Sequence, residues 1–165
     1  MKQQRREVFV FADRCMGCHS CELACATAHT AAGNLYGAIL GGETGYGRIF
    51  IDLTPTGSRV PVHCHHCANA PCVAACPMDA MRQREDRTSY LDEENCIGCW
   101  SCVAECPFGY LQNSDFLPIK CDRNCLDDEG VPACVRACPT HALVYMTTAE
   151  YSAARRRPRA KAAAR

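Results

Sequence analysis

The chain has 165 residues, the length of one domain or two small ones, and its formal charge is balanced at 18 basic against 18 acidic side chains. Sixteen residues are cysteine and one is tryptophan. This composition excludes a protein that depends on a large hydrocarbon core. It is typical of either a secreted disulfide scaffold or an intracellular metal or redox protein.

The N-terminal segment "MKQQRREVFVFADRC" separates these two classes. A secretory signal needs an apolar stretch of about 7 to 15 residues, whereas only residues 8–12 are apolar before Asp13. Arg5 and Arg6 lack the apolar region of a twin-arginine signal, and no run reaches the about 18 apolar residues of a membrane span. We therefore expect a cytoplasmic protein with reduced thiols, whose residues 7–13 form a strand.

The first cysteine group, "CMGCHSCELAC" at residues 15–25, overlaps a segment without internal glycine, residues 20–29, that favours a short helix. Residues 33–47 contain six glycines and predict a loop, which is either a flexible connection or a docking loop for a partner. Their glycine spacing does not match a nucleotide-binding motif. Residues 48–53 are rich in β-branched and aromatic side chains and predict a strand.

Three further cysteine groups follow, at residues 64–76, 96–106 and 121–138. Residues 70–76 favour a helical turn, and residues 142–148 predict a final strand. The sequences "CPMDAM", "CPFGYL" and "CPTHAL" each place proline after the last cysteine of a group and an apolar residue five positions after that cysteine. They indicate a duplicated unit, in which proline turns the chain away from the cysteine.

The cysteine spacing predicts iron–sulfur clusters. Three cysteines at i, i+3 and i+6 can present their sulfurs to three corners of one compact object, whereas zinc is typically held by two pairs separated by a spacer of about a dozen residues. The run C-x₂-C-x₂-C-x₃-C-P is that of bacterial ferredoxins, whose fourth cysteine binds the other of two clusters. A helical turn carries that cysteine away from its own loop, so the four groups should work in pairs as two modules of two clusters. We therefore predict four [4Fe–4S] clusters.

From Cys15 to about Thr148 the chain resembles the four-cluster ferredoxin-type electron-transfer subunits. The segments "RCMGCHSCELACATAH", "PVHCHHCANAPCVAACP" and "KCD" before "PACVRACPTHAL" are most similar to the iron–sulfur protein that accompanies carbon monoxide dehydrogenase, and to its relatives in formate dehydrogenase–hydrogenase complexes. The resemblance implies an α+β, ferredoxin-like fold over residues 1–150. In it the first and fourth groups share two clusters and the two middle groups share the other two.

Carried over by position, this architecture implies four ligand sites. Each site takes three cysteines from one group and the fourth from the partner group. The sites are site 1, Cys15, Cys18, Cys21 and Cys138; site 2, Cys64, Cys67, Cys72 and Cys106; site 3, Cys96, Cys99, Cys102 and Cys76; and site 4, Cys121, Cys125, Cys134 and Cys25. The fourth group departs from the family pattern, because three residues separate Cys121 from Cys125 where two are usual, so its loop should bulge by one residue.

Histidines also lie near the cysteine groups. Because every group already has four cysteines, we expect the histidines to form hydrogen bonds to cluster sulfur or to water rather than to bind metal. This expectation covers His19, His29, His63, His65, His66 and His141.

Residues 154–165 contain six basic residues and no acid, which leaves 12 basic against 18 acidic residues in the rest of the chain. We expect residues 151–165 to form a disordered basic tail, with docking on an acidic partner or on anionic lipid at the inner membrane surface as alternatives. Binding of nucleic acid is disfavoured because the acidic body would repel it.

Four complete cysteine sets leave no iron position open for a substrate, so we expect an electron carrier rather than an enzyme. The resemblance implies carbon monoxide dehydrogenase as the electron donor and a hydrogenase or another redox protein as the acceptor. A subunit of a formate dehydrogenase or of another molybdenum enzyme is the alternative within the same class. A zinc-binding interaction module is the alternative from a different class.

Overall fold

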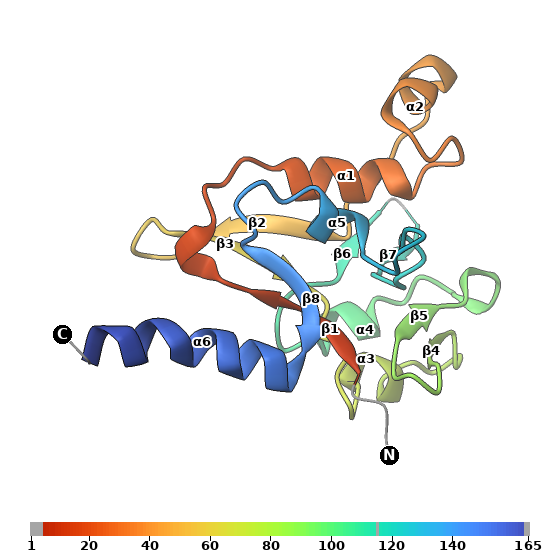
Figure 1. The fold of residues 1–165 in the computed structure, drawn as a ribbon. Coiled ribbons are helices and arrows are strands. Elements are labelled where there is room, and N and C mark those ends of the chain that lie inside the picture. Colours follow the sequence, from red (N-terminus) through yellow and green to blue (C-terminus); the bar gives the residue numbers. More distant parts are fainter. Residues whose placement is uncertain (1–4, 115, 164–165) are drawn as a thin grey trace.

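The computed structural model describes residues 5–114 and 116–163. Eight short strands form four separate two-stranded antiparallel sheets: β1 (Arg6–Val10) with β8 (Leu143–Thr147), β2 (Ile49–Leu53) with β3 (Arg59–His63), β4 (Met81–Gln83) with β5 (Ser89–Leu91), and β6 (Gln112–Asn113) with β7 (Pro118–Ile119). Because β1 pairs with β8, the two ends of the cysteine-rich region lie side by side (Figure 1).

The helices are also short, apart from the last one. They are α1 (Ser20–Ala28), α2 (Leu35–Gly41), α3 (Pro71–Ala74), α4 (Ser101–Ala104), α5 (Ala133–Arg136) and α6 (Thr148–Ala163), with two 3₁₀ turns at Ala12–Arg14 and Glu93–Asn95. Helices α1, α3, α4 and α5 each contain or follow cysteines of one group. The expected strands at residues 48–53 and 142–148 and the expected helical turns at residues 20–29 and 70–76 are confirmed, as is the mixed α and β character of the fold. The strand expected at residues 7–13 is confirmed only for residues 7–10, because residues 12–14 form a 3₁₀ turn.

Cysteines make up much of the buried interior, which consists of two separate cores. The first core combines Ile49, Ala142 and Leu143 with buried cysteines of the first and fourth groups, namely Cys21, Cys25, Cys134 and Cys138. The second core combines Ala70, Met81, Tyr110 and Leu111 with cysteines of the two middle groups, of which Cys72 and Cys102 are buried. Each of the two cores therefore buries little hydrocarbon. Cysteine thiols occupy positions where a larger protein would place leucine or valine.

The repeated Cys-Pro segments attach the cysteine loops to these cores. The apolar residue five positions after the fourth cysteine is Met81, Leu111 or Leu143, and each is at most 5% exposed. Three residues after the same cysteine, the backbone has a positive φ at Asp79, Gly109 and His141. The proline and this left-handed residue together turn the chain sharply, so that the apolar side chain returns to the core after each cysteine.

Residues 33–47 were expected to be loop, and the structure corrects this for α2. The side chain of Asn34 accepts a hydrogen bond from Gly37 N at 2.8 Å, and Gly42 ends the helix in the left-handed conformation at φ 65°. An asparagine cap and a glycine stop are helix signals that outweigh the glycine content of this segment. The helix projects from the body (Figure 1), and Tyr36 and Leu40 are 80% and 88% exposed.

The disordered tail expected from residue 151 is also corrected, because residues 148–163 form α6. Thr147 and Glu150 form a capping box: Glu150 Oε2 accepts from Thr147 N at 2.8 Å, and Thr147 Oγ1 accepts from Glu150 N at 3.3 Å. Tyr151 stacks on Phe9, with 4.4 Å between the ring centroids, and its hydroxyl donates to Val10 O at 3.0 Å. The capping box at the start of α6 and the packing of Tyr151 on β1 therefore stabilise this helix. Residues 164–165 lie outside the described residues.

Within the described part of the chain, no helix is long and apolar enough to cross a membrane.

Replacing Thr147 with alanine removes the oxygen that accepts from Glu150 N. We expect Thr147→Ala to destabilise the start of α6 by about 1 kcal/mol, measured as faster amide hydrogen exchange of residues 148–156 in the loaded protein. Thr148→Ala is the matched control, because it removes a threonine hydroxyl and leaves the capping oxygen in place. Equal exchange in the two variants would contradict the capping role of Thr147.

Candidate metal centres

All four cysteine loops turn at the same backbone position, two residues after the first cysteine of the group. The residues at this position have positive φ angles: Gly17 (70°), His66 (44°), Gly98 (64°) and Arg123 (58°). The left-handed conformation is easy for glycine and costly for other residues. The loops therefore repeat one backbone geometry four times, although only two of the four residues are glycine. The repeat of cysteines is visible in the sequence, but the repeated left-handed turn was not predicted from it.

Two cavities are lined by complete predicted ligand sets. The four cysteines of site 2 line one cavity together with Tyr110 and Lys120. The four cysteines of site 3 line the other together with Met81 and Trp100. In each cavity the fourth cysteine, Cys106 or Cys76, comes from the opposite middle group. The structure thus brings together the members of both sites that the sequence places in different groups.

Five cysteines of sites 1 and 4, namely Cys15, Cys21, Cys25, Cys134 and Cys138, meet in the first core, whereas Cys121 of site 4 packs against the second core. Burial is the largest cause that raises the pKa of the Cys134 thiol, and the charges of the other site 4 members, Cys25, Cys121 and Cys125, raise it further. Burial likewise raises the pKa of Cys21 to about 11, with a contribution from Cys138. Cys25 and Cys134, as well as Cys21 and Cys138, belong to the same buried cluster. The fourth cysteine of each site therefore lies beside cysteines of its partner group.

Cysteines of different sites also influence one another. Besides burial, charges on cysteines of another site raise the pKa values of several thiols. The pairs are Cys21 with Cys134 for sites 1 and 4, Cys64 with Cys121 for sites 4 and 2, and Cys72 with Cys102 for sites 2 and 3. These interactions link site 1 to site 4, site 4 to site 2, and site 2 to site 3.

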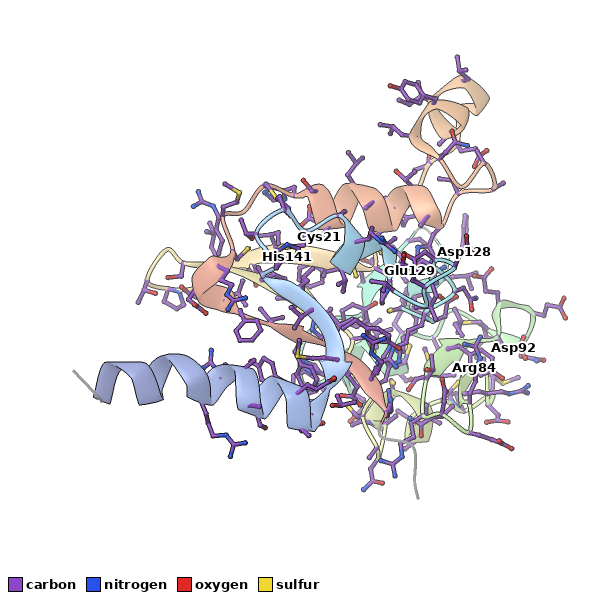
Figure 2. All side chains as sticks on the ribbon, in the orientation of Figure 1. Cys21, Arg84, Asp92, Asp128, Glu129 and His141 are labelled. Carbon is purple, nitrogen blue, oxygen red and sulfur yellow. The ribbon has the colours of Figure 1, made fainter. Side chains whose placement is uncertain are left out.

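The two ends of this series reach the protein surface. Of the sixteen cysteines, only Cys18 in site 1 and Cys99 in site 3 are exposed. Figure 2 shows Cys21, on α1, well separated from Asp92, which lies four residues before the third cysteine group. Sites 1 and 3 each have one exposed cysteine, whereas the cysteines of sites 4 and 2 are buried or partly exposed.

Protons must leave the core when metal binds. Burial raises the pKa of Cys102 to about 11 and that of Cys121 to about 12. Such thiols are neutral at physiological pH, and they become thiolates only when a bound cation replaces the proton. No disulfide forms among the sixteen cysteines, all of which are within the described residues. All sixteen are thus free to bind metal.

Several cysteine sulfurs accept hydrogen bonds, among them Cys76 and Cys25, two of the cysteines expected to cross between groups. Cys76 Sγ accepts from Ala80 N at 3.3 Å and from Met81 N at 3.4 Å, and Cys25 Sγ accepts from Arg48 N at 3.2 Å. Donors of this kind stabilise negative charge on ligand sulfur and raise the potential of a bound cluster. They also fix the orientation of the crossing cysteines.

The additional residue in the fourth group is accommodated by a turn around Asp122. Its carboxylate accepts from Asn124 N at 3.1 Å, pairs with Arg48, and lies 3.5 Å from His29 Nε2. Burial raises the pKa of Asp122, but hydrogen bonds from His29 and Arg48 outweigh burial and hold that pKa well below its usual range. Asp122 therefore ties the enlarged loop to α1 and to the segment before β2.

Three of the six histidines near the sites contact the protein backbone through their side chains, whereas His19 pairs with the carboxylate of Glu22. His66 Nδ1 accepts from Ser89 N at 3.1 Å, His63 Nδ1 lies 3.0 Å from Cys64 O, and His29 Nδ1 lies 2.7 Å from Cys25 O. Burial, followed by the charge of Lys120, lowers the pKa of His66 to about 2, so its ring is neutral. These contacts give the three histidines roles in shaping the cysteine loops.

The repeated loop geometry leads to a prediction at Gly98. A Cβ added at Gly98 would lie 2.9 Å from Phe116 O, and φ is +64°. We expect Gly98→Ala to destabilise the third loop by at least the about 1–2 kcal/mol of a left-handed L-residue, measured as faster iron release to a chelator. Gly33→Ala is the control, because φ is +63° there but the added Cβ meets nothing within 4 Å. Iron release no faster than in the control would contradict the packing constraint.

Comparison with known proteins agrees with this geometry. A model for a 4Fe-4S dicluster domain matches residues 56–148, which contain the last three cysteine groups. A model for a 4Fe-4S binding domain matches residues 12–28, which contain the first group. The two matches together include all sixteen cysteines.

Relatives match over most of the chain. The chain is 35% identical to "Iron-sulfur protein" of Rhodospirillum rubrum, over 95% of this chain and 91% of the relative. It is 40% identical to "Putative electron transport protein YsaA" of Escherichia coli K12, over 84% and 88%. It is 33% identical to "Formate hydrogenlyase subunit 2" of the same strain, over 82% and 79%.

The chain spans only 20% of another relative, "Putative oxidoreductase UacF" of Escherichia coli K12, at 42% identity. The dicluster match covers more than half of the chain, and the relatives of similar length match nearly end to end. The chain therefore belongs to the 4Fe-4S dicluster family, as an electron-transfer iron–sulfur protein that binds multiple [4Fe–4S] clusters.

Proposed function

We propose that sites 1 to 4 each hold one [4Fe–4S] cluster, in two modules that correspond to the two cores. The observation that supports this most strongly is the crossing of the fourth cysteine, since Cys106 lines the cavity of site 2 and Cys76 lines that of site 3. The first module comprises sites 1 and 4, and the second comprises sites 2 and 3.

The geometry favours a cluster over zinc. Zinc requires three or four ligands that converge on one ion. Among residues 5–114 and 116–163, no three His, Cys, Asp or Glu side chains converge in this way. At sites 2 and 3 the four thiols instead surround a cavity with apolar walls, which suits a larger inorganic core. This is the argument against the zinc-binding interaction module.

Bound [4Fe–4S] clusters supply one-electron transfer. We propose the order 1, 4, 2, 3 for the four sites, which is supported by the interactions between thiols of different sites and by the exposure of only Cys18 and Cys99 among the sixteen cysteines. We propose that electrons enter at one exposed end, Cys18 or Cys99, and leave at the other. The protein itself then has no catalytic residue and serves as a conductor between two redox partners.

Carbon monoxide dehydrogenase is our proposed donor, and a hydrogenase or another redox protein is our proposed acceptor. The support is the similarity of "RCMGCHSCELACATAH" and "PVHCHHCANAPCVAACP" to the iron–sulfur protein of that system. The relative named formate hydrogenlyase subunit 2 favours a second candidate, a formate dehydrogenase complex. In either case we propose a cytoplasmic protein that reaches the inner membrane surface only through its partner, since reducing conditions keep the thiols free.

The donor can be identified by optical bleaching of the anaerobic, oxidised protein. We expect CO with catalytic amounts of carbon monoxide dehydrogenase to bleach the cluster absorbance, because matched docking surfaces accelerate electron transfer. Formate with its dehydrogenase is the matched alternative. Bleaching by formate with no bleaching by CO would replace the first candidate with the second.

Crossed ligation predicts a specific effect of losing Cys106. We expect Cys106→Ser to damage the cluster of site 2, because the replaced sulfur lines that cavity with Cys64, Cys67 and Cys72. Iron content and the electron paramagnetic resonance (EPR) spectrum of the reduced protein measure the effect. Cys76→Ser is the matched control and should alter the site 3 signal instead. If Cys106→Ser and Cys76→Ser altered the same signal, the crossed assignment would be wrong.

A further inference from the structure

Lys120 is a buried lysine whose ammonium group points at a predicted cluster ligand. It follows β7, immediately before the fourth cysteine group, and is 4% exposed. Its Nζ donates to Cys64 Sγ at 2.7 Å and to Cys121 O at 3.3 Å. The lysine thus belongs to the fourth group in sequence but contacts site 2 in space.

The surroundings hold this side chain in place. The ring of Tyr110 lies 5.9 Å from Lys120 Nζ, and Tyr110 is 2% exposed. The Tyr110 hydroxyl accepts from Cys121 N at 2.7 Å. Lys120 and Tyr110 therefore lie together at the boundary between sites 4 and 2, where the two modules meet.

The charge of Lys120 has no carboxylate partner in the described part of the chain. Among the described residues, no Asp or Glu oxygen lies within ion-pair distance of Lys120 Nζ. A buried ammonium is costly unless an anion compensates it. The sulfur of Cys64 is the group it contacts, so the compensating charge has to come from the thiolates of site 2 and the cluster they bind. This charge grows by one unit when a cluster is reduced.

We propose that Lys120 raises the reduction potential of the cluster held at site 2. The inference rests on the proposed cluster sites. A cation within hydrogen-bond distance of a ligand sulfur favours the reduced cluster, which carries the greater negative charge. Site 3 in the same module differs, because among the described residues no lysine or arginine side chain donates a hydrogen bond to the sulfur of Cys76, Cys96, Cys99 or Cys102. Lys120 therefore gives the site 2 cluster a higher reduction potential than the site 3 cluster. An added electron then resides preferentially at site 2, next to the boundary between the two modules.

The test is a potentiometric titration of the anaerobic full-length protein, followed by EPR, after iron and sulfide have been counted. The site 2 signal is the one that Cys106→Ser alters. In Lys120→Met we expect the midpoint potential of that signal to fall, with smaller changes in the other signals. Lys120→Arg should restore the potential, because it retains the charge. Arg156→Met is the matched control: it removes one positive charge from an exposed side chain of α6, where solvent screens the effect.

Lys120→Gln separates charge from hydrogen bonding, because it keeps an N–H donor without the positive charge. A potential in the Gln variant as low as that in the Met variant identifies charge as the cause. Fully loaded Met and Gln variants with an unchanged site 2 potential would overturn the proposal. Loss of the cluster in both neutral variants would also overturn it, in favour of a purely structural lysine. If the wild-type protein lacks a site 2 cluster, the iron count shows that the proposed function, and not this inference alone, has failed.

Discussion

The structure depends on the departure of the fourth cysteine from its own loop. Each group turns three cysteines around a left-handed residue and then sends the fourth along a short helix to a partner group. The two cores form where these crossing cysteines arrive. Because the sheets have only two strands each, hydrocarbon packing and strand pairing add little on their own. Metal binding and folding should therefore be closely coupled.

The crossing also explains the functional layout. In the proposed arrangement the first group pairs with the fourth and the second with the third, in two modules whose contact is the boundary at Cys64, Lys120 and Cys121. The two exposed cysteines, Cys18 and Cys99, belong to the two ends of the proposed series, and no cysteine of the other two sites is exposed. An electron conductor needs this arrangement, because redox partners must approach the clusters at the two ends. The clusters between the ends must be protected from water.

Local signals made much of this predictable. The β-branched runs gave β1, β2 and β8, and the proline after three of the fourth cysteines marked the turns that return Met81, Leu111 and Leu143 to the core. The helices α2 and α6 were missed although Asn34, Gly42, Thr147 and Glu150 are ordinary capping residues. Composition, six glycines in one segment and a basic run in the other, outweighed the caps. The left-handed His66 and Arg123 and the contact of Lys120 with Cys64, 56 residues away, depend on tertiary structure and leave no local pattern.

The most direct test of the account is the native mass of the anaerobically purified full-length protein, with iron and sulfide counted on the same sample. The crossed sites predict a mass with four [4Fe–4S] clusters, which means about 16 iron and 16 sulfide per chain. A protein that reaches only two clusters under full reconstitution, or that contains zinc without sulfide, would contradict the account.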